Sequence, residues 1–102
     1  MVIVAGWMQL DAKDRDAFLE LKREATLATR AEKGCIEYVF TPDPFEPGRA
    51  RVFERWETLA DQEAHVKLAI SGQSSSPQPY PVLGQELYVH TVSDSRPWAR
   101  PR

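Results

Sequence analysis

Four short segments of the chain combine apolar and β-branched residues over a length that suits a strand better than a helix. The first of them is apolar at both odd and even positions, which is typical of a strand covered on both faces. The other three alternate less regularly and are bounded by turn-forming residues. The predicted strands are residues 2–10, 35–41, 49–57 and 85–92.

A longer segment between the first two strands, residues 12–33, carries apolar residues at helical spacing. We expect Asp11 to cap its first turn, and Gly34 to adopt the left-handed conformation that often follows a helix. The predicted buried stripe of this helix consists of Phe18, Leu21, Ala25 and Ala28.

A second helix is predicted at residues 59–70, although its apolar stripe is weaker. Thr58 followed by Asp61 resembles a capping box in which Asp replaces the usual Glu. Residues 71–81, which are rich in serine and proline, are predicted to form a loop.

The predicted elements follow the order β-α-β-β-α-β, which is the ferredoxin-like arrangement of the α+β class. It gives a four-stranded antiparallel sheet with both helices on one face. We expect one domain at residues 1–92 and a flexible tail at residues 93–102. Since the other face of the sheet would expose large apolar side chains, we expect it to be covered by a second copy of the chain in a homodimer.

Composition narrows the class of protein further. The 102 residues carry a net charge of −2, and the three arginines of the last seven residues mask a more acidic body. This distribution does not favour a nucleic-acid partner, which would require a basic face. The first residues lack the pattern of a signal peptide, no apolar run reaches the length of a membrane span, and there is one cysteine, Cys35. We therefore expect a cytoplasmic protein.

Three motifs along the middle of the chain are similar to those of a known family. The sequence Gly-Cys-Ile-Glu-Tyr at residues 34–38 precedes the proline-rich turn, and Phe-Glu-Arg-Trp-Glu-Thr-Leu follows at residues 53–59. Glu-Ala-His then occupies residues 63–65 of the second predicted helix. Together these motifs resemble the antibiotic biosynthesis monooxygenase (ABM) family, and the resemblance in architecture extends over residues 2–92.

The resemblance implies a dimeric α+β barrel with a pocket in each subunit between the sheet and the helices. It also implies a cofactor-independent monooxygenase that acts on a small quinol or an aromatic polyketide-like compound with O₂. In such chemistry the electron-rich phenolate itself reduces O₂, so the protein must bind, desolvate and deprotonate its substrate. The two histidines and one cysteine show no ligand spacing, so no metal is expected either.

The motif residues Trp56 and His65 are the predicted catalytic pair. Trp56 would line the pocket, and the imidazole of His65 could accept the proton of a phenol. Glu54 shares a sheet face with Trp56, and a buried carboxylate there needs a partner such as His65 or a nearby arginine. For each residue a purely structural role in the core is the alternative interpretation.

Further aromatic residues could bind the substrate or simply pack in the core. Besides Glu54, the predicted substrate-binding residues are Trp7, Tyr38 and Tyr88. His90 shares a face with Tyr88, and Cys35 is interpreted as a small buried residue rather than a nucleophile.

The sequence also departs from the family in ways that keep other functions open. Val52 stands where the most similar oxygenases have an asparagine that contacts substrate, so that contact is missing. The haem-degrading branch needs an asparagine near the end of the first strand and a tryptophan at position 65, and this chain has Gly6, Trp7 and His65 there, so haem degradation is not expected. The alternatives to a monooxygenase are a non-catalytic dimeric domain, either ligand-binding or structural, and an isomerase on the same fold.

Overall fold

The computed structural model describes residues 1–70 and 78–101 of the chain. It contains the predicted order of elements, β-α-β-β-α-β, and thereby confirms the α+β, ferredoxin-like class. The elements are β1 (Val2–Gln9), α1 (Arg15–Arg30), β2 (Cys35–Pro42), β3 (Arg49–Trp56), α2 (Leu59–Ile70) and β4 (Gly84–Thr91).

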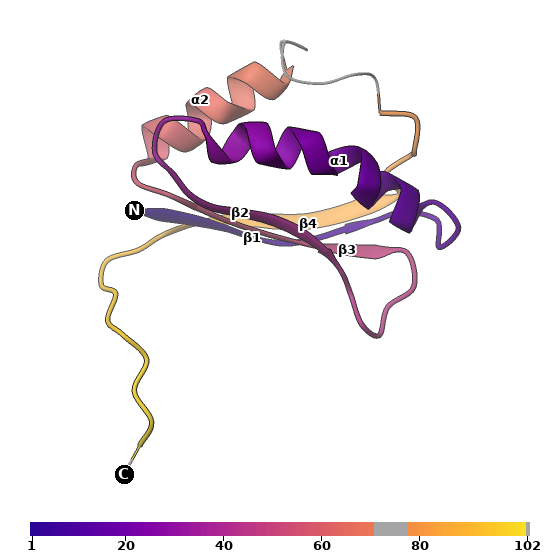
Figure 1. The fold of residues 1–102 in the computed structure, drawn as a ribbon. Helices are drawn as coiled ribbons and strands as arrows, with labels where there is room; N and C mark the ends of the chain where they lie inside the picture. Colours follow the sequence, from indigo (N-terminus) through magenta and orange to yellow (C-terminus); the bar gives the residue numbers. More distant parts are fainter. Residues whose placement is uncertain (71–77, 102) are drawn as a thin grey trace.

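The four strands form one antiparallel sheet in the order β2-β3-β1-β4. Both helices lie on the same side of this sheet (Figure 1). The register places Val2 opposite Trp56, and Val4 between Glu54 on β3 and Val89 on β4. The helix-facing side chains of three strands therefore meet beneath α1 and α2.

The core on this face divides into two clusters. Val2, Tyr38 and Trp56 form one cluster near the start of β1. Leu10, Phe18 and Ala50 form the other near its end. The ring of Phe40 packs against both, so the two clusters are connected through β2.

The first turn of α1 differs from the prediction. Asp14, not Asp11, is the N-cap residue, and the helix begins at Arg15. The Asp11 carboxylate instead accepts a hydrogen bond from the backbone N–H of Lys13 at 3.0 Å. The assignment of Asp11 as N-cap was therefore wrong, because its side chain closes a short turn that precedes the helix.

The buried side of α1 is also rotated from the predicted stripe. Phe18 and Thr29 are buried, but Leu21 is 41% exposed and Ala28 is exposed. Lys22, in contrast, is half-buried on the side of α1 that faces the sheet. A prediction from apolar residues alone places a lysine on the solvent side. Its aliphatic stem can pack on apolar surface while the ammonium reaches the edge.

Gly34 adopts the predicted left-handed conformation, with φ of +80°. The helix has already ended at Arg30, so Gly34 turns the chain into β2 rather than closing α1. A Cβ atom at this position would lie 2.1 Å from Oδ2 of Asp61, in the first turn of α2. The glycine thus permits close contact between the α1–β2 turn and α2.

Helix α2 begins as the capping pattern predicts, since the Oγ1 of Thr58 accepts a hydrogen bond from the N–H of Asp61 at 3.1 Å. Only Gln62 of this helix is buried, which agrees with its weak apolar stripe. Neither α1 nor α2, the two helices in the described part of the chain, is long and apolar enough to cross a membrane.

The face of the sheet opposite the helices is open within the described residues (Figure 1). Ile3, Ala5 and Trp7 of β1 project to it, since they alternate with the buried Val2 and Val4. The guanidinium carbon of Arg49 lies 3.9 Å from the centre of the Trp7 ring and covers part of it. We call this surface the open face.

Candidate functional site

A cavity of about 380 Å³ lies between α2 and the helix-facing side of β1, β3 and β4. Its size falls within the range of small-molecule sites in proteins. Most of its wall is aliphatic, and the polar side chains are confined to three residues, Glu54, Gln62 and His65. The apolar lining residues are Val4, Val66, Ala69, Ile70, Leu87 and Val89.

The polar end of this cavity is built on a pair of residues from β3. Glu54 and Trp56 are two positions apart in a strand, so both point toward the helices. The indole Nε1 of Trp56 donates a hydrogen bond to Oε1 of Glu54 at 2.9 Å. This corrects the expectation that His65 or an arginine is the partner of Glu54, since Arg49, Arg51 and Arg55 alternate to the open face.

His65 approaches this pair from α2. Its ring stacks on Trp56, with 5.2 Å between the ring centres and 29° between the planes. Tyr38 meets the same imidazole edge-on at 5.3 Å. The three rings come from β2, β3 and α2, so the motif residues that are distant in sequence form one aromatic cluster.

Glu32 completes the site, and the sequence analysis missed it. Its Oε1 and Oε2 lie 3.1 and 3.3 Å from Nδ1 of His65. Glu32 belongs to the turn between α1 and β2, 33 positions before the histidine, where no motif marks it. In the sequence Glu32 stands out only as an acidic residue two positions before Gly34. The structure shows that the turn at Gly34 approaches α2.

The contact with Glu32 defines the chemistry of the imidazole. An ionised carboxylate only accepts hydrogen bonds, so Nδ1 of His65 carries the donated proton. In the neutral ring Nε2 is then the nitrogen that can accept a proton. His65 also lines the cavity, and its side chain is 14% exposed. A carboxylate thus orients the imidazole at the wall of the cavity.

Burial shifts the protonation of the neighbouring groups. The pKa of Glu54 is raised, because loss of hydration outweighs the opposing effects of the hydrogen bond from Trp56 and of the nearby His65. Burial, reinforced by the negative charges of Glu54 and Glu32, raises the pKa of Tyr38 well above its usual range. The phenol of Tyr38 therefore remains neutral, and it cannot serve as a base at physiological pH.

The structure brings four of the six predicted site residues together and separates the other two. Glu54 and His65 line the cavity, whereas Trp56 is fully buried behind them and Tyr38 packs beside it. Trp7 and Tyr88 lie on the open face, on the other side of the sheet, and Tyr88 is 60% exposed. His90 accompanies Tyr88 there, at 6.3 Å between ring centres.

No group of three or more histidine, cysteine, aspartate or glutamate side chains within residues 1–70 and 78–101 is arranged to hold a metal ion. The thiol of Cys35 is part of the periphery of the Trp56 cluster and is half-buried. Burial and the nearby carboxylates of Glu32 and Glu54 raise the pKa of this thiol. It therefore stays protonated, as expected for a packing residue.

Comparison with known proteins decides the family. The family model for antibiotic biosynthesis monooxygenases matches residues 1–71, more than two thirds of the chain. The chain belongs to the ABM family. The match includes β1, both motif regions and the whole of α2, and so contains Glu32, Glu54, Trp56 and His65.

Solved structures share the ABM fold at low sequence identity. A protein of Deinococcus radiodurans, classed as a candidate antibiotic biosynthesis monooxygenase, is 19% identical, with a TM-score of 0.74 over 97% of this chain and 99% of its own. The haem-degrading protein MhuD of Mycobacterium tuberculosis is 14% identical, with a TM-score of 0.75 over 95% of this chain and 100% of its own. At these identities the likeness concerns the fold alone.

One curated relative is an uncharacterized protein of Synechocystis, 29% identical over 66 residues. The aligned region is 65% of this chain and 45% of that protein. The chain thus matches less than half of the length of this relative.

Proposed function

We propose that this ABM-family chain is a cofactor-independent monooxygenase that oxidises a small quinol or aromatic polyketide-like compound with O₂. The observation that carries the proposal is the His65–Glu32 pair, set at the polar end of an otherwise aliphatic cavity. Aliphatic walls offer apolar contact to the flat body of a phenolic substrate. The imidazole supplies the one base that the reaction requires.

In this mechanism Nε2 of His65 takes the proton of the substrate phenol. Glu32 stabilises the imidazolium that forms, because its carboxylate accepts the Nδ1 hydrogen bond. The phenolate is electron-rich enough to reduce O₂ without another redox group. At a methylene carbon between two rings, one oxygen atom becomes the new carbonyl, and the other leaves as water with the two methylene hydrogens.

Glu54 and Trp56 have supporting roles in the proposal. Oε1 of Glu54 is engaged by the indole of Trp56, so Oε2 is the atom through which this carboxyl can hydrogen-bond a substrate hydroxyl. Trp56 has no exposed surface, so it is a positioning residue that fixes the planes of Glu54 and His65. Tyr38 supports the edge of the same imidazole.

We further propose that the active form is a homodimer joined through the open face. The apolar side chains of this face are uncovered within one chain, and burying them against a second copy would remove them from water. The connection between β2 and β3 and the tail both extend past the sheet on this side (Figure 1). Trp7 and Tyr88 would then belong to the interface rather than to the cavity under α2.

The proposal is tested by O₂ consumption with naphthohydroquinone and anthrone, corrected for spontaneous oxidation. We expect turnover, with one atom of isotopically labelled O₂ in the anthrone product. His65→Gln should abolish it, and Glu32→Gln should reduce kcat about tenfold to a thousandfold by removing the orienting carboxylate. Glu63→Gln, which removes a similar charge from the exposed side of α2, should have no effect.

A second candidate is a ligand-binding domain without catalysis. Val52 favours it, because this residue is 3% exposed on the helix-facing side of β3 and brings no polar group to the position where related oxygenases have asparagine. A folded protein that binds the same phenols in the cavity under α2 but consumes no O₂ above the spontaneous rate would favour this function over the monooxygenase. Failure of both binding and turnover would exclude both for these substrates.

A further inference from the structure

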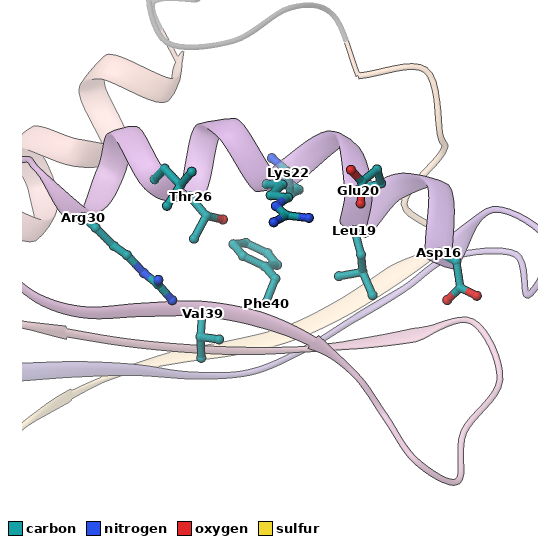
Figure 2. A pocket seen from close by; sticks show the side chains of 10 residues that line it. Asp16, Leu19, Glu20, Lys22, Thr26, Arg30, Val39 and Phe40 are labelled. Carbon is teal, nitrogen blue, oxygen red and sulfur yellow. The ribbon is translucent and has the colours of Figure 1, made fainter.

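A second cavity, of about 420 Å³, lies between α1 and the edge strand β2 (Figure 2). It shares no lining residue with the cavity under α2. Its lining combines aliphatic and aromatic side chains with three cations and two carboxylates. The lining residues are Asp16, Leu19, Glu20, Lys22, Arg23, Thr26, Leu27, Arg30, Val39 and Phe40.

The apolar part of this second cavity is held in place by the core. The Phe40 ring projects from β2 toward α1 (Figure 2). Its centre lies 6.4 Å from the centre of the Phe18 ring and 5.5 Å from that of the Tyr38 ring. These contacts fix the ring, so the surface that it offers to the cavity is preformed. Leu19 and Leu27 of α1 extend the apolar wall.

Lys22 brings a cation onto this apolar surface. Its Nζ lies 5.5 Å from the centre of the Phe18 ring and 5.8 Å from that of Phe40. Burial lowers the pKa of this ammonium. Among residues 1–70 and 78–101 no carboxylate forms an ion pair with it, so the two rings are the groups that compensate its lost hydration.

Arg30 supplies a second, immobilised cation. Its side chain spans from α1 to β2 (Figure 2), where Nε donates a hydrogen bond to the backbone carbonyl of Tyr38 at 2.9 Å. This bond uses Nε and leaves the two terminal nitrogens of the guanidinium for another acceptor. Of the two acids, Asp16 lies at the opposite end of the cavity and is paired with Arg15 at 3.2 Å.

We infer that this second cavity binds a small apolar monocarboxylate, with the carboxylate at Lys22 and the apolar body on Phe40. The anion would supply the counter-charge that Lys22 lacks. Arg30, about 12 Å further along the axis of α1, adds to the positive charge of the cavity without touching the same carboxylate. The apolar body would cover the Phe40 ring and the leucines of α1. Aromatic and aliphatic acids share this chemistry, so the experiment compares the two.

The test is titration of the intact protein with naphthoate, octanoate and the neutral analogue naphthalene methanol, followed by amide NMR shifts. We expect at least one of the two acids to bind, with shifts in the segment from Thr26 to Arg30 and at Val39 and Phe40. The neutral analogue should bind the wild-type protein about tenfold more weakly than the acids do. Each acid should also bind Lys22→Met about tenfold more weakly than it binds the wild type. Lys13→Met removes the same charge from an exposed position before α1 and should leave the Kd unchanged.

The relative affinity of the two acids identifies the source of the ligand, since Phe40 gives an aromatic acid a stacking surface. A Kd that is equal for the carboxylate and the neutral analogue, or unaltered in folded Lys22→Met, would overturn the inference. So would an absence of binding, or shifts confined to the cavity under α2 at Val66, Leu87 and Val89.

Discussion

At the scale of single residues, the structure shows how far one hydrogen bond can change the role of a side chain. The contact with Glu32 engages Nδ1 of His65 and leaves Nε2 as the ring nitrogen that faces a possible ligand without a carboxylate partner. The motif around Trp56 identified the histidine, but a motif records neighbours in sequence. Glu32 reaches His65 only through the turn at Gly34, so the sequence alone could not pair them.

Asp43 gives a residue-scale prediction on pH. Its carboxylate accepts hydrogen bonds from the N–H groups of Phe45 and Glu46 at 2.8 and 2.9 Å, and from Arg51 at 2.8 Å. These contacts lower the pKa of Asp43 to about 2. Because the pKa of Asp43 is lower in the folded than in the unfolded state, its ionised carboxylate stabilises the fold at every pH above the ordinary aspartate pKa. This contribution is lost as the pH falls toward 2.

We therefore expect Asp43→Asn to lower the urea midpoint of unfolding at pH 7 and to narrow its difference from the wild type as the pH falls below 4. Urea titrations at several pH values between 7 and 2.5 measure this. Asp94→Asn, which removes a carboxylate from the exposed tail, serves as the control and should follow the wild type at each pH. A constant gap for Asp43→Asn over the whole range would contradict the assignment.

At the scale of elements, the sequence predicted every helix and strand of the described chain, with ends that differ by at most three residues. Short apolar strands and a capping motif are local features, and local features can be read from neighbours in sequence. The rotation of α1 could not, because it depends on Lys22 lying over Phe18 and Phe40. The hydrophobic pattern of the sequence predicts that such a lysine faces solvent, although its aliphatic stem packs like an apolar side chain.

Gly34 gives an element-scale prediction. Alanine at this position would adopt an unfavourable positive φ and would crowd the Asp61 side chain at the start of α2. We expect Gly34→Ala to lower the free energy of unfolding by about 1–2 kcal/mol or more. Gly84→Ala is the matched control, because a Cβ there has no neighbour within 4 Å. Equal stability of the two variants in chemical denaturation would refute the proposed role of the close contact.

At the scale of the whole molecule, the sheet has one face packed by helices and one face open. Phe53 lies at the centre of the open face, paired with Ala5 on β1 and Val39 on β2. An arginine placed there would lie between Arg51 and Arg55, which alternate to the same face, and would be buried without a partner if two sheets join. The exposed Leu21, on α1 and thus on the opposite side of the sheet from the open face, offers a similar change outside the proposed interface.

We expect the wild-type protein to sediment at twice the 11.6 kDa mass of one chain. Phe53→Arg should shift it to the mass of one chain at micromolar concentration, and Leu21→Arg should leave it unchanged. Sedimentation equilibrium measures all three. A wild-type protein of normal stability that sediments as a single chain would remove the argument for a barrel formed by two copies.

The order of the strands has a consequence for the dynamics of the cavity under α2. β2 and β4 are the two edge strands of the sheet. Since α1 packs on β2, whereas β4 pairs only with β1 in the described structure, β4 is the edge strand that can separate more readily. Leu87 and Val89 of this strand are also part of the cavity wall. Opening of β4 would therefore open the cavity, and any molecule bound inside would hold the strand closed. Ligand occupancy and amide protection of the edge strand are thus two measures of one equilibrium.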